Sequence, residues 1–411
     1  MSKSWMRILA ILLVFGVVAA ACGDDDDGAS DEGDGELKIG YVLPQTGGLA
    51  GIVDALVKPL EMAEEEIKAA GGSFTMIPGD SGTDGDIASA TVDQLINDGV
   101  DVIIGPAATG VTLSVIDKVT SSGIVECSGS TTGAVFSDYA DDGYYFRTSP
   151  PDSIQGPVLA DVITDDGRSS VAIIHRNDEY GVGFASFLAG ALEANGVAVP
   201  AVVPIDENAT SYDAEIGQVA QAGADAVVLI TFGEGAALMQ GMIEADLGPA
   251  DIATYVTDGF KDEVTWDEVD PDNPAVFDGI RGTAPSIAPP DGEATFPERF
   301  AAFAPGVPTI FSAFFYDCLN IVVLASEQAG SDDPAKIVEN MQSVTVGGTT
   351  CTSYAECSDL IAEGEDIDYA GASGSVDFND NGEPTSGTYD IYQYDAEGAT
   401  QVQDTVTLLN E

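Results

Sequence analysis

Two loops rich in hydroxyl groups contain residue types that could hold a small anion. The first is Gly105–Gly110 and the second is Ser128–Gly133, and each follows an apolar run. In parallel α/β sheets such loops lie at strand C-termini, where the next helix presents free N–H groups and the positive end of its dipole. No basic side chain lies in either loop. A carboxylate would therefore be held by hydroxyls and backbone N–H groups, unless the hydroxyls only cap helices. The hydroxyl side chains belong to Thr109, Ser130, Thr131 and Thr132.

The segments around these loops alternate between short apolar runs and amphipathic stretches. Predicted strands are 37–43, 74–77, 100–104, 124–127, 171–175, 197–204, 226–230, 252–256, 388–394 and 402–409. Predicted helices are 50–70, 87–97, 111–120, 182–194, 212–222 and 236–245, and a helical stretch returns over 300–330. Continuous apolar strands separated by helices indicate parallel sheets covered on both faces. Right-handed crossovers then produce a doubly wound α/β architecture. The length predicts two core-forming units, with Pro-rich crossings at 149–152 and 284–291.

The charge balance of the chain is strongly acidic. Seventy Asp and Glu residues stand against 13 Lys and Arg, a formal net charge of −57. Such a field repels nucleic acid and anionic lipid, so neither is expected as a partner. The main interpretation is a solubilising surface. Calcium binding is the alternative, but Asn379–Glu383 is the nearest approach to a calcium loop and is predicted to be a turn. No metal or cofactor is expected.

The N-terminal region has the layout of an export signal. A short basic start and the apolar run Ile8–Ala21 precede Cys22. This pattern predicts a lipoprotein signal peptide over residues 1–21, cleaved before Cys22, whose sulfur would carry the lipid. A transmembrane anchor is the alternative, but the run is short for a span of roughly 20 residues. The acidic, Gly-rich segment 22–36 predicts a flexible tether that holds the folded part outside the cytoplasm, at the cell membrane.

The remaining four cysteines suit disulfide formation in that compartment. Cys351 and Cys357 lie close together in a polar stretch, which predicts a local disulfide. Cys127 and Cys318 are then the remaining pair, and their pairing depends on the fold. A zinc site is not expected, because paired Cys-x-x-Cys spacing is missing.

The sequence gives little support to catalysis. The single histidine, His175, ends a predicted strand and is expected in a surface or loop role. No nucleophile elbow, phosphate-binding loop or zinc-protease helix motif occurs. We therefore expect that the protein is not an enzyme.

Six segments together resemble the type I periplasmic binding proteins of the branched-chain amino acid class. They are Lys38–Gly48, Ile103–Thr109, Gly123–Thr132, Tyr145–Gly156, Asn177–Gly183 and Tyr316–Asp317. The resemblance implies two Rossmann-like lobes joined by three crossings, with a ligand held between them. Lobe I would combine 37–149 with 286–384, and lobe II would combine 150–285 with 385–411. Cys127 and the helix of Cys318 would then share lobe I, which favours their disulfide.

The resemblance also implies roles for the polar residues. Thr109 and Thr132 occupy positions where family members bind the α-carboxylate of an amino acid, and backbone atoms of Ser130 assist. Asp258 follows strand 252–256, where family members place an acidic residue that accepts the ammonium. Asp is one methylene shorter than the Glu that is common there, which leaves its reach open.

Small and aromatic residues would form the apolar walls of the same site. Ala107 and Ala108 would come from lobe I, Tyr180 and Phe232 from lobe II, and Phe311 from the later helical region. Phe232 stands where a tyrosine is common in branched-chain amino acid binders, so one hydroxyl contact would be missing. The walls favour an aliphatic amino acid, although an amide, a urea-like compound or another small organic solute fits the same frame.

The expected mechanism is hinge closure around the ligand, because each lobe would hold half of the contacts. The resemblance implies that a membrane permease of an ATP-driven (ABC) importer recognises the closed form. A ligand-sensing receptor domain of the same fold is the alternative. No transmembrane or signalling segment follows the second lobe, which favours transport. A monomer is expected.

Overall fold

The computed structural model describes residues 35–410. The predicted signal peptide, Cys22 and most of the predicted tether therefore lie outside the described residues. The last two tether residues, Gly35 and Glu36, are described, and the extent of the tether stays a prediction. The backbone N–H groups of Gly35 and Glu36 donate to Asp332 Oδ2 at 2.7 and 2.9 Å. Fixed contacts thus begin two residues earlier than the apolar pattern indicates.

Lobe I is built around a five-stranded sheet in the order β2-β1-β3-β4-β5, and every strand pair in it is parallel. Its strands are β1 (Lys38–Leu43), β2 (Thr75–Asp80), β3 (Val102–Ile104), β4 (Val125–Ser128) and β5 (Tyr145–Arg147). The helices between them are η2 (Ala50–Ile52), α2 (Val53–Ala70), α3 (Gly85–Asp98), α4 (Thr109–Ser121) and η3 (Ala134–Asp138). β3 and β4 are buried along their whole length, as continuous apolar runs predict. Their C-terminal ends present the two hydroxyl-rich loops.

Lobe II is built around a seven-stranded sheet in the order β15-β14-β10-β9-β8-β6-β7. Its strands are β6 (Ser170–Arg176), β7 (Ala198–Ile205), β8 (Ala226–Ile230), β9 (Ala253–Val256), β10 (Arg281–Pro285), β14 (Ser386–Tyr394) and β15 (Thr400–Leu409). Its helices are α5 (Asp152–Asp165), α6 (Glu179–Ala194), α7 (Asp213–Ala222), α8 (Gly235–Glu244), α9 (Trp266–Val269) and η4 (Pro274–Phe277). The predicted parallel pairing is confirmed for β6, β7, β8 and β9, and β10 is also parallel to β9. β14 is antiparallel to both of its neighbours, β10 and β15, and it forms a hairpin with β15.

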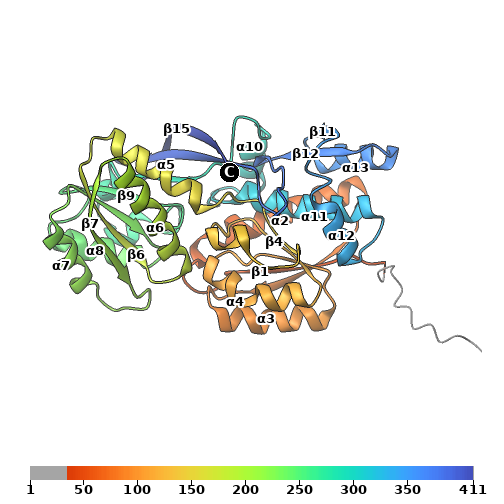
Figure 1. Ribbon diagram of the computed structural model, residues 1–411, viewed down its shortest axis with the longest axis horizontal. Helices are drawn as coiled ribbons and strands as arrows, with labels where there is room; N and C mark the ends of the chain where they lie inside the picture. The colour runs from red at the N-terminus through yellow and green to blue at the C-terminus, as the bar shows by residue number, and fades with distance from the viewer. Residues whose placement is uncertain (1–34, 411) are drawn as a thin grey trace, which may run out of the picture. The chain divides into compact units, whose positions relative to one another are not determined.

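The chain between β10 and β14 adds helices to lobe I. These elements are α10 (Phe296–Phe303), α11 (Ser312–Ala329), α12 (Pro334–Met341), α13 (Tyr354–Glu363), and a small sheet of β11 (Thr349–Cys351), β12 (Ile367–Gly371) and β13 (Gly374–Ser375). α11 packs against α2, β3 and β4, and Figure 1 shows it beside α2. The helical stretch predicted over 300–330 is interrupted at 304–311, where Pro305 and Pro308 stand.

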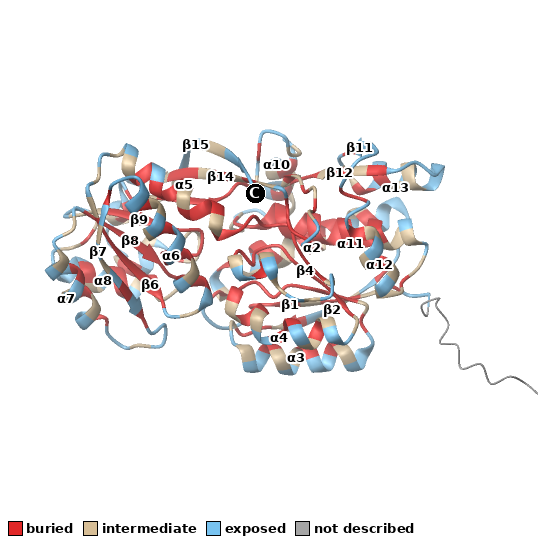
Figure 2. Ribbon diagram, viewed as in Figure 1, coloured by how far each residue is buried: buried red, intermediate tan, exposed pale blue. Residues whose placement is uncertain are grey.

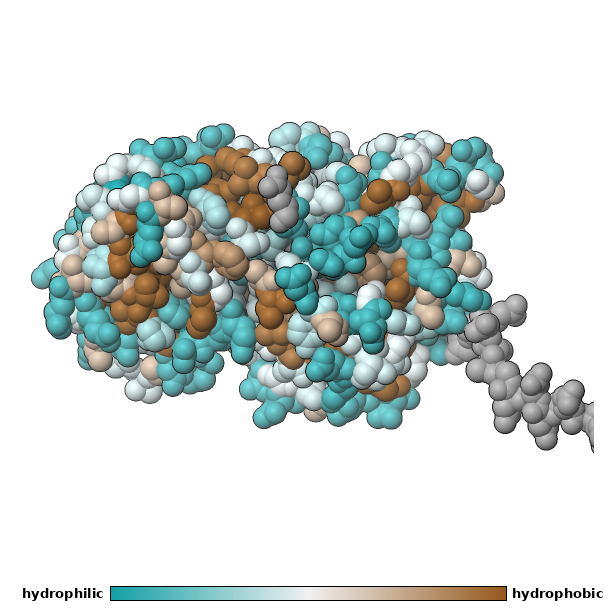
Figure 3. All heavy atoms as spheres, viewed as in Figure 1, coloured by the Kyte–Doolittle hydropathy of each residue, from teal (hydrophilic) through white to brown (hydrophobic). Residues whose placement is uncertain are grey.

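The polypeptide passes between the two sheets three times: after β5, after β10 and before β14. The exact boundaries predicted for the lobes stay a prediction. Figure 2 shows that the central strands of both sheets are buried, whereas exposed residues gather on the outer faces of the helices and on edge strands such as β15. Figure 3 shows mainly hydrophilic residues on the visible face, with smaller hydrophobic patches between them. Among the residues described, no helix has the length and apolarity to span a membrane.

Both predicted disulfides are present in the structure. Cys127 in β4 bonds Cys318 in α11, with the two Cα atoms 6.1 Å apart. Cys351 at the end of β11 bonds Cys357 in α13, with a Cα separation of 5.4 Å. The first disulfide joins the strand that carries a hydroxyl-rich loop to the helix that follows Phe311.

Candidate functional site

A small cavity is lined by residues of both lobes. Lobe I contributes the ends of β3 and β4, the start of α2 and the residue before α11, and lobe II contributes α6 and the loops after β8 and β9. The lining residues are Leu49, Ile52, Ala107, Ala108, Thr109, Ser130, Thr132, Tyr180, Phe232, Asp258, Gly259 and Phe311. The only ionisable side chains among these residues are the carboxyl of Asp258 and the phenol of Tyr180.

The lobe I side of the cavity is a polar edge built at a helix N-terminus. Thr109 is the first residue of α4, and the preceding residue, Ala108, has no side chain that could cap the helix. The first-turn N–H groups therefore lack a side-chain cap at the place where the cavity begins. Ser130 Oγ donates to Ala107 O at 3.0 Å, and Gly133 N donates to Thr109 Oγ1 at 3.2 Å. These bonds hold the two hydroxyl-rich loops together.

Thr131 does not line the cavity, although it was predicted as a ligand contact. Its hydroxyl lies 2.8 Å from Ser128 Oγ and 2.9 Å from Thr112 Oγ1, and it donates to Pro106 O at 3.2 Å. Thr132 lines the cavity, whereas the Thr131 side chain is buried in the interior of the lobe. Its contact with Thr112 joins the loop to α4. Its function in the structure is to position the loop.

A buried ion pair stabilises the loop Ser128–Gly133. Arg147, which is completely buried, pairs with Glu383 and also donates to the carbonyl oxygen of Gly133 at 2.8 Å. The Arg147 charge holds the pKa of Glu383 below its ordinary value, in spite of the burial that raises it. The Arg147 guanidinium thus binds the loop and Glu383, and it does not line the cavity.

Asp258 provides the negative charge on the lobe II side. It follows β9 and is 5% exposed. Its Oδ1 accepts hydrogen bonds from Gln155 Nε2 at 2.7 Å and from the Tyr180 hydroxyl at 3.3 Å. Burial raises its pKa to about 6, and the hydrogen bonds offset only part of that rise. Among the described residues, no Lys, Arg or His forms an ion pair with this carboxylate.

Asp152 is a second buried acid beside this one, and the sequence analysis missed it. It is the first residue of α5 and is 1% exposed. Both of its carboxylate oxygens are buried, and the Thr132 side chain and the Arg147 charge favour their ionised form. Burial raises its pKa well above the ordinary value, and the charge of Asp258 raises it further. In the sequence, Asp152 stands in the predicted crossing that begins with Ser149-Pro-Pro. No local pattern distinguishes one buried acid among 70 acidic residues.

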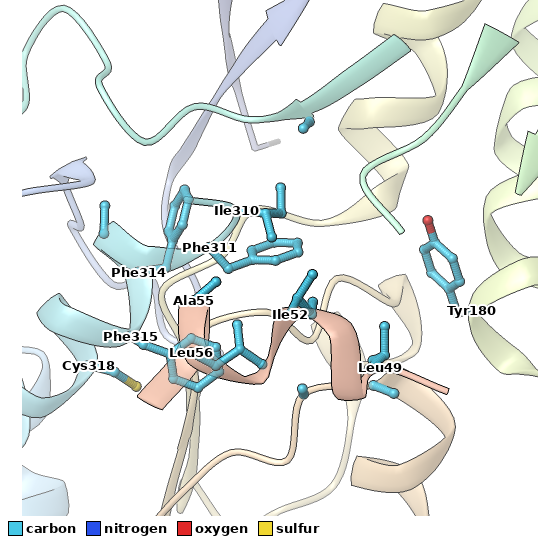
Figure 4. Close-up of a cluster of buried hydrophobic side chains, with 14 of the residues drawn as sticks. Leu49, Ile52, Ala55, Leu56, Tyr180, Ile310, Phe311, Phe314, Phe315 and Cys318 are labelled. Carbon is cyan, nitrogen blue, oxygen red and sulfur yellow. The ribbon is translucent and has the colours of Figure 1, made fainter. Parts of the chain in front are cut away.

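The apolar walls combine a stacked aromatic pair with aliphatic side chains. The rings of Tyr180 and Phe232 stack with centroids 5.3 Å apart. The guanidinium of Arg176 lies 4.0 Å from the centroid of the Phe232 ring. Arg176 also forms ion pairs with Asp178 and Glu234. Figure 4 shows Phe311 beside Ile310 and Ile52, with Tyr180 across from Leu49. Leu49 and Ile52 were not predicted, because they belong to a loop and a short 3₁₀ turn without a distinctive pattern.

The structure brings nine of the ten predicted contact residues to one cavity, and their role as ligand contacts stays a prediction. His175 lies outside the cavity. It is 6% exposed, with Nδ1 2.7 Å from the carbonyl oxygen of Arg176, so the prediction of a surface role is wrong. Asn379–Glu383 forms a turn, with Gly382 N donating to Asn379 O. Within residues 35–410, no group of His, Cys, Asp and Glu side chains is arranged to hold a metal ion.

A family model described as periplasmic binding protein matches residues 36–399. The chain belongs to the periplasmic binding protein family. The family is one of extracytoplasmic solute-binding proteins, so ligand capture is its general function. In this periplasmic binding protein, the cavity between the two lobes is therefore the site to consider for a solute.

Relatives and solved structures agree with this family assignment. Leu/Ile/Val-binding protein homolog 3 of Brucella melitensis is 23% identical over 381 residues, covering 88% of this chain and 92% of the relative. The branched-chain amino acid transporter substrate binding protein LivJ of Streptococcus pneumoniae, solved with isoleucine, has a TM-score of 0.75 and 18% identity, covering 91% of this chain and 100% of LivJ. An ABC transporter solute binding protein of R. palustris, solved with benzoate, has a TM-score of 0.73 and 17% identity, covering 92% and 98%. The two solved structures support the fold.

Proposed function

We propose that this protein captures a small amino acid with an aliphatic side chain outside the cytoplasm and delivers it to the permease of an ABC importer. One observation carries the proposal. The cavity joins the uncapped N-terminus of α4 on one lobe to the buried carboxylate of Asp258 on the other, with no basic side chain among its lining residues. An anion site thus faces a cation site across one small cavity.

A zwitterion is the ligand that satisfies both ends of this cavity. A carboxylate suits the N–H groups of α4 and the hydroxyls of Thr109 and Thr132. An ammonium suits Asp258, since a buried carboxylate without a partner is costly. The walls of Phe232, Phe311 and aliphatic residues suit an apolar side chain. The name of the Brucella melitensis relative, Leu/Ile/Val-binding, supports the same ligand class.

The two-lobe arrangement supports capture by closure. Because the anion site and the cation site belong to different lobes, only a closed molecule can satisfy both ligand charges, and a bound ligand shifts the population toward that state. We propose that a lipid on Cys22 and the acidic segment after it would keep the protein near its permease. The protein would act as a monomer and contribute no enzymatic step.

A small aromatic acid is a second candidate ligand. The solved R. palustris protein with benzoate has the same fold, and the stacked rings of Tyr180 and Phe232 offer an aromatic face. Benzoate, however, has no cationic group for Asp258. The amino acid is therefore the better match to the charges of the cavity.

A ligand panel tests the proposal directly. We expect leucine, isoleucine or valine to raise the midpoint of thermal unfolding, because a ligand at 100 times its Kd stabilises the folded state by about 2.7 kcal/mol. Benzoate and the amide of leucine serve as comparison ligands, and calorimetry gives the affinities. Stabilisation by benzoate alone would favour the second candidate. No response to any amino acid would contradict the proposal.

A further inference from the structure

We propose that Arg176 determines the size of ligand side chain that the cavity accepts, by holding the Phe232 ring in place as a fixed wall. The inference rests on the proposed function and deepens it, because it names a residue that sets the selectivity of the same cavity. Arg176 is not among the residues that line the cavity, whereas Phe232 is. Arg176 is therefore a positioning residue, and its effect on the ligand passes through the ring.

The guanidinium of Arg176 packs on the face of the Phe232 ring. Its central carbon lies 4.0 Å from the ring centroid, and both residues are only 5% exposed. The Tyr180 ring also stacks on Phe232, with an angle of 18° between the two planes. A cation over an aromatic ring contributes more when water is excluded from the contact. Phe232 is therefore held by a buried cation as well as by its aromatic neighbour.

Two acidic side chains keep the guanidinium in this position. Arg176 Nε donates to Asp178 Oδ2 at 2.7 Å, and one of its terminal nitrogens donates to Glu234 Oε1 at 2.8 Å. Asp178 caps the N-terminus of α6, the helix that carries Tyr180. Glu234 Oε1 also accepts a hydrogen bond from the backbone N–H of Phe232 at 3.0 Å. A single guanidinium thus joins the two segments that carry the aromatic pair.

Arg176 separates the Phe232 ring from a neighbouring hollow. Arg176 and Glu234 line that hollow, whereas Phe232 lines the ligand cavity and not the hollow. The guanidinium is held by two charge-assisted hydrogen bonds, so it cannot move aside without breaking them. Without the guanidinium, the ring would be free to turn toward the hollow, and the cavity would gain room for a larger ligand side chain.

This arrangement predicts a change in selectivity and not only in affinity. A well-packed apolar pocket discriminates by about 10-fold to 200-fold on one methylene. Leucine and phenylalanine share the charged groups of an amino acid and differ in the size of the side chain. A fixed Phe232 should therefore favour leucine, and a mobile Phe232 should admit phenylalanine as well. A role of Arg176 in folding alone would weaken the binding of both ligands by the same factor.

Calorimetry with leucine and phenylalanine on the wild type and two double variants tests the inference. Arg176→Met/Glu234→Gln removes the guanidinium without leaving the Glu234 charge unpaired, and the Gln oxygen can still accept from Phe232 N. We expect the leucine-to-phenylalanine affinity ratio to fall at least about threefold. Arg281→Met/Asp166→Asn is the matched control, since it removes another ion pair of lobe II whose residues do not line the cavity. The control should keep the wild-type ratio.

The same substitutions in the background of Phe232→Leu show whether Arg176 acts through the ring. Once the ring is absent, Arg176→Met/Glu234→Gln should change the affinity ratio no further. The single variant Arg176→Lys keeps a positive charge for both acids but lacks the planar guanidinium. Its leucine-to-phenylalanine ratio should therefore lie below that of the wild type.

The outcomes separate the inference from the proposed function. A wild-type ratio in R176M/E234Q, the same fall in the Phe232→Leu background, or a wild-type protein that binds both ligands equally well would overturn the inference and leave the proposed function intact. If the R176M/E234Q protein does not fold, the Arg176→Lys ratio decides the matter, and an unchanged ratio overturns the inference. If the wild-type protein binds no amino acid, both fail together.

Discussion

At the scale of single residues, Asp258 combines burial with the absence of a cationic partner, and pH should therefore control ligand binding. Burial raises its pKa to about 6, and only the ionised form accepts an ammonium. Below pH 6 a proton must leave before the ligand binds. We expect the contribution of Asp258 to leucine affinity to weaken as the pH falls from 6 to 4.5, by up to about tenfold per pH unit. Calorimetry across this range measures the effect.

The Asp258→Asn variant isolates this residue. Loss of a charge-assisted contact should weaken leucine binding by about 10-fold to 100-fold at pH 7, and the acid-side decline should become smaller. Glu193→Gln, which changes an exposed acid on α6, is the matched control. An unchanged affinity in D258N would show that another group meets the ammonium.

Residues of the site differed in how far they could be predicted. Thr109 and Asp258 follow apolar strands, and the C-terminal ends of parallel strands meet at one edge of a sheet, so their positions could be predicted from sequence order and family resemblance. Asp152 and Leu49 could not. Their burial depends on how α5 and the loop before α2 pack in three dimensions, and no periodic pattern reports this.

At the scale of elements, the disulfide between β4 and α11 should contribute more stability than the local one. The residues of Cys127–Cys318 are 191 positions apart, and those of Cys351–Cys357 only 6 apart. In the chain-entropy description these separations correspond to about 5 and about 2 kcal/mol. We expect the double variant Cys127→Ala/Cys318→Ala to lose clearly more free energy of unfolding in urea than Cys351→Ala/Cys357→Ala. Equal losses would mean that native packing around β4 compensates for the bond.

The elements themselves were predictable where periodicity was strong. β8 was predicted with its observed bounds, Ala226–Ile230, because a short, wholly apolar run is typical of a central strand. β10 was missed. It begins with Arg281 and contains Gly282 and Pro285, so its place in the sheet comes from pairing with β9 and β14 and not from a local pattern. The antiparallel direction of β14 is likewise a property of the connections.

At the scale of the whole molecule, an acid of lobe II reaches the backbone of lobe I. A side-chain carbon at Gly51 would lie 3.0 Å from Glu263 Oε2, which is a tight contact, so the carboxyl group packs closely against the Gly51 backbone. Close by, Gly233 N approaches Gly48 O at 3.4 Å. Burial raises the pKa of Glu263 to about 8, although backbone N–H groups of Gly51 and Ile52 favour its ionised form. Contact between the lobes thus depends on a carboxyl group that holds its proton.

The surroundings of Glu263 make this dependence stronger. Glu234 and Glu268 raise its pKa further by their negative charge. Asp84 and Glu207 line the same hollow of about 820 Å³. The one basic side chain that lines it, Arg176, is engaged by Asp178 and Glu234. The described residues that line this hollow therefore offer no unengaged cation to an ionised Glu263.

Closure of the lobes should consequently add a proton to Glu263. The resulting change of affinity with pH is opposite in sign to the change caused by Asp258. In an open molecule Glu263 would be solvated, with an ordinary pKa of about 4.3, whereas contact raises it to about 8. A raised pKa stabilises the closed state at low pH, and this contribution is lost as the pH rises toward 8.

We expect leucine affinity to decline between pH 6 and pH 8, by at most about tenfold per pH unit. Glu263→Gln, which imitates the protonated group, should bind more tightly than the wild type at pH 8 and lose this decline. It should also show the full acid-side decline due to Asp258, which proton uptake by Glu263 opposes in the wild type below pH 6. Calorimetry from pH 4.5 to 8.5, with Glu193→Gln as the control, separates the two groups, and a wild-type slope above pH 6 in Glu263→Gln would exclude Glu263 from closure.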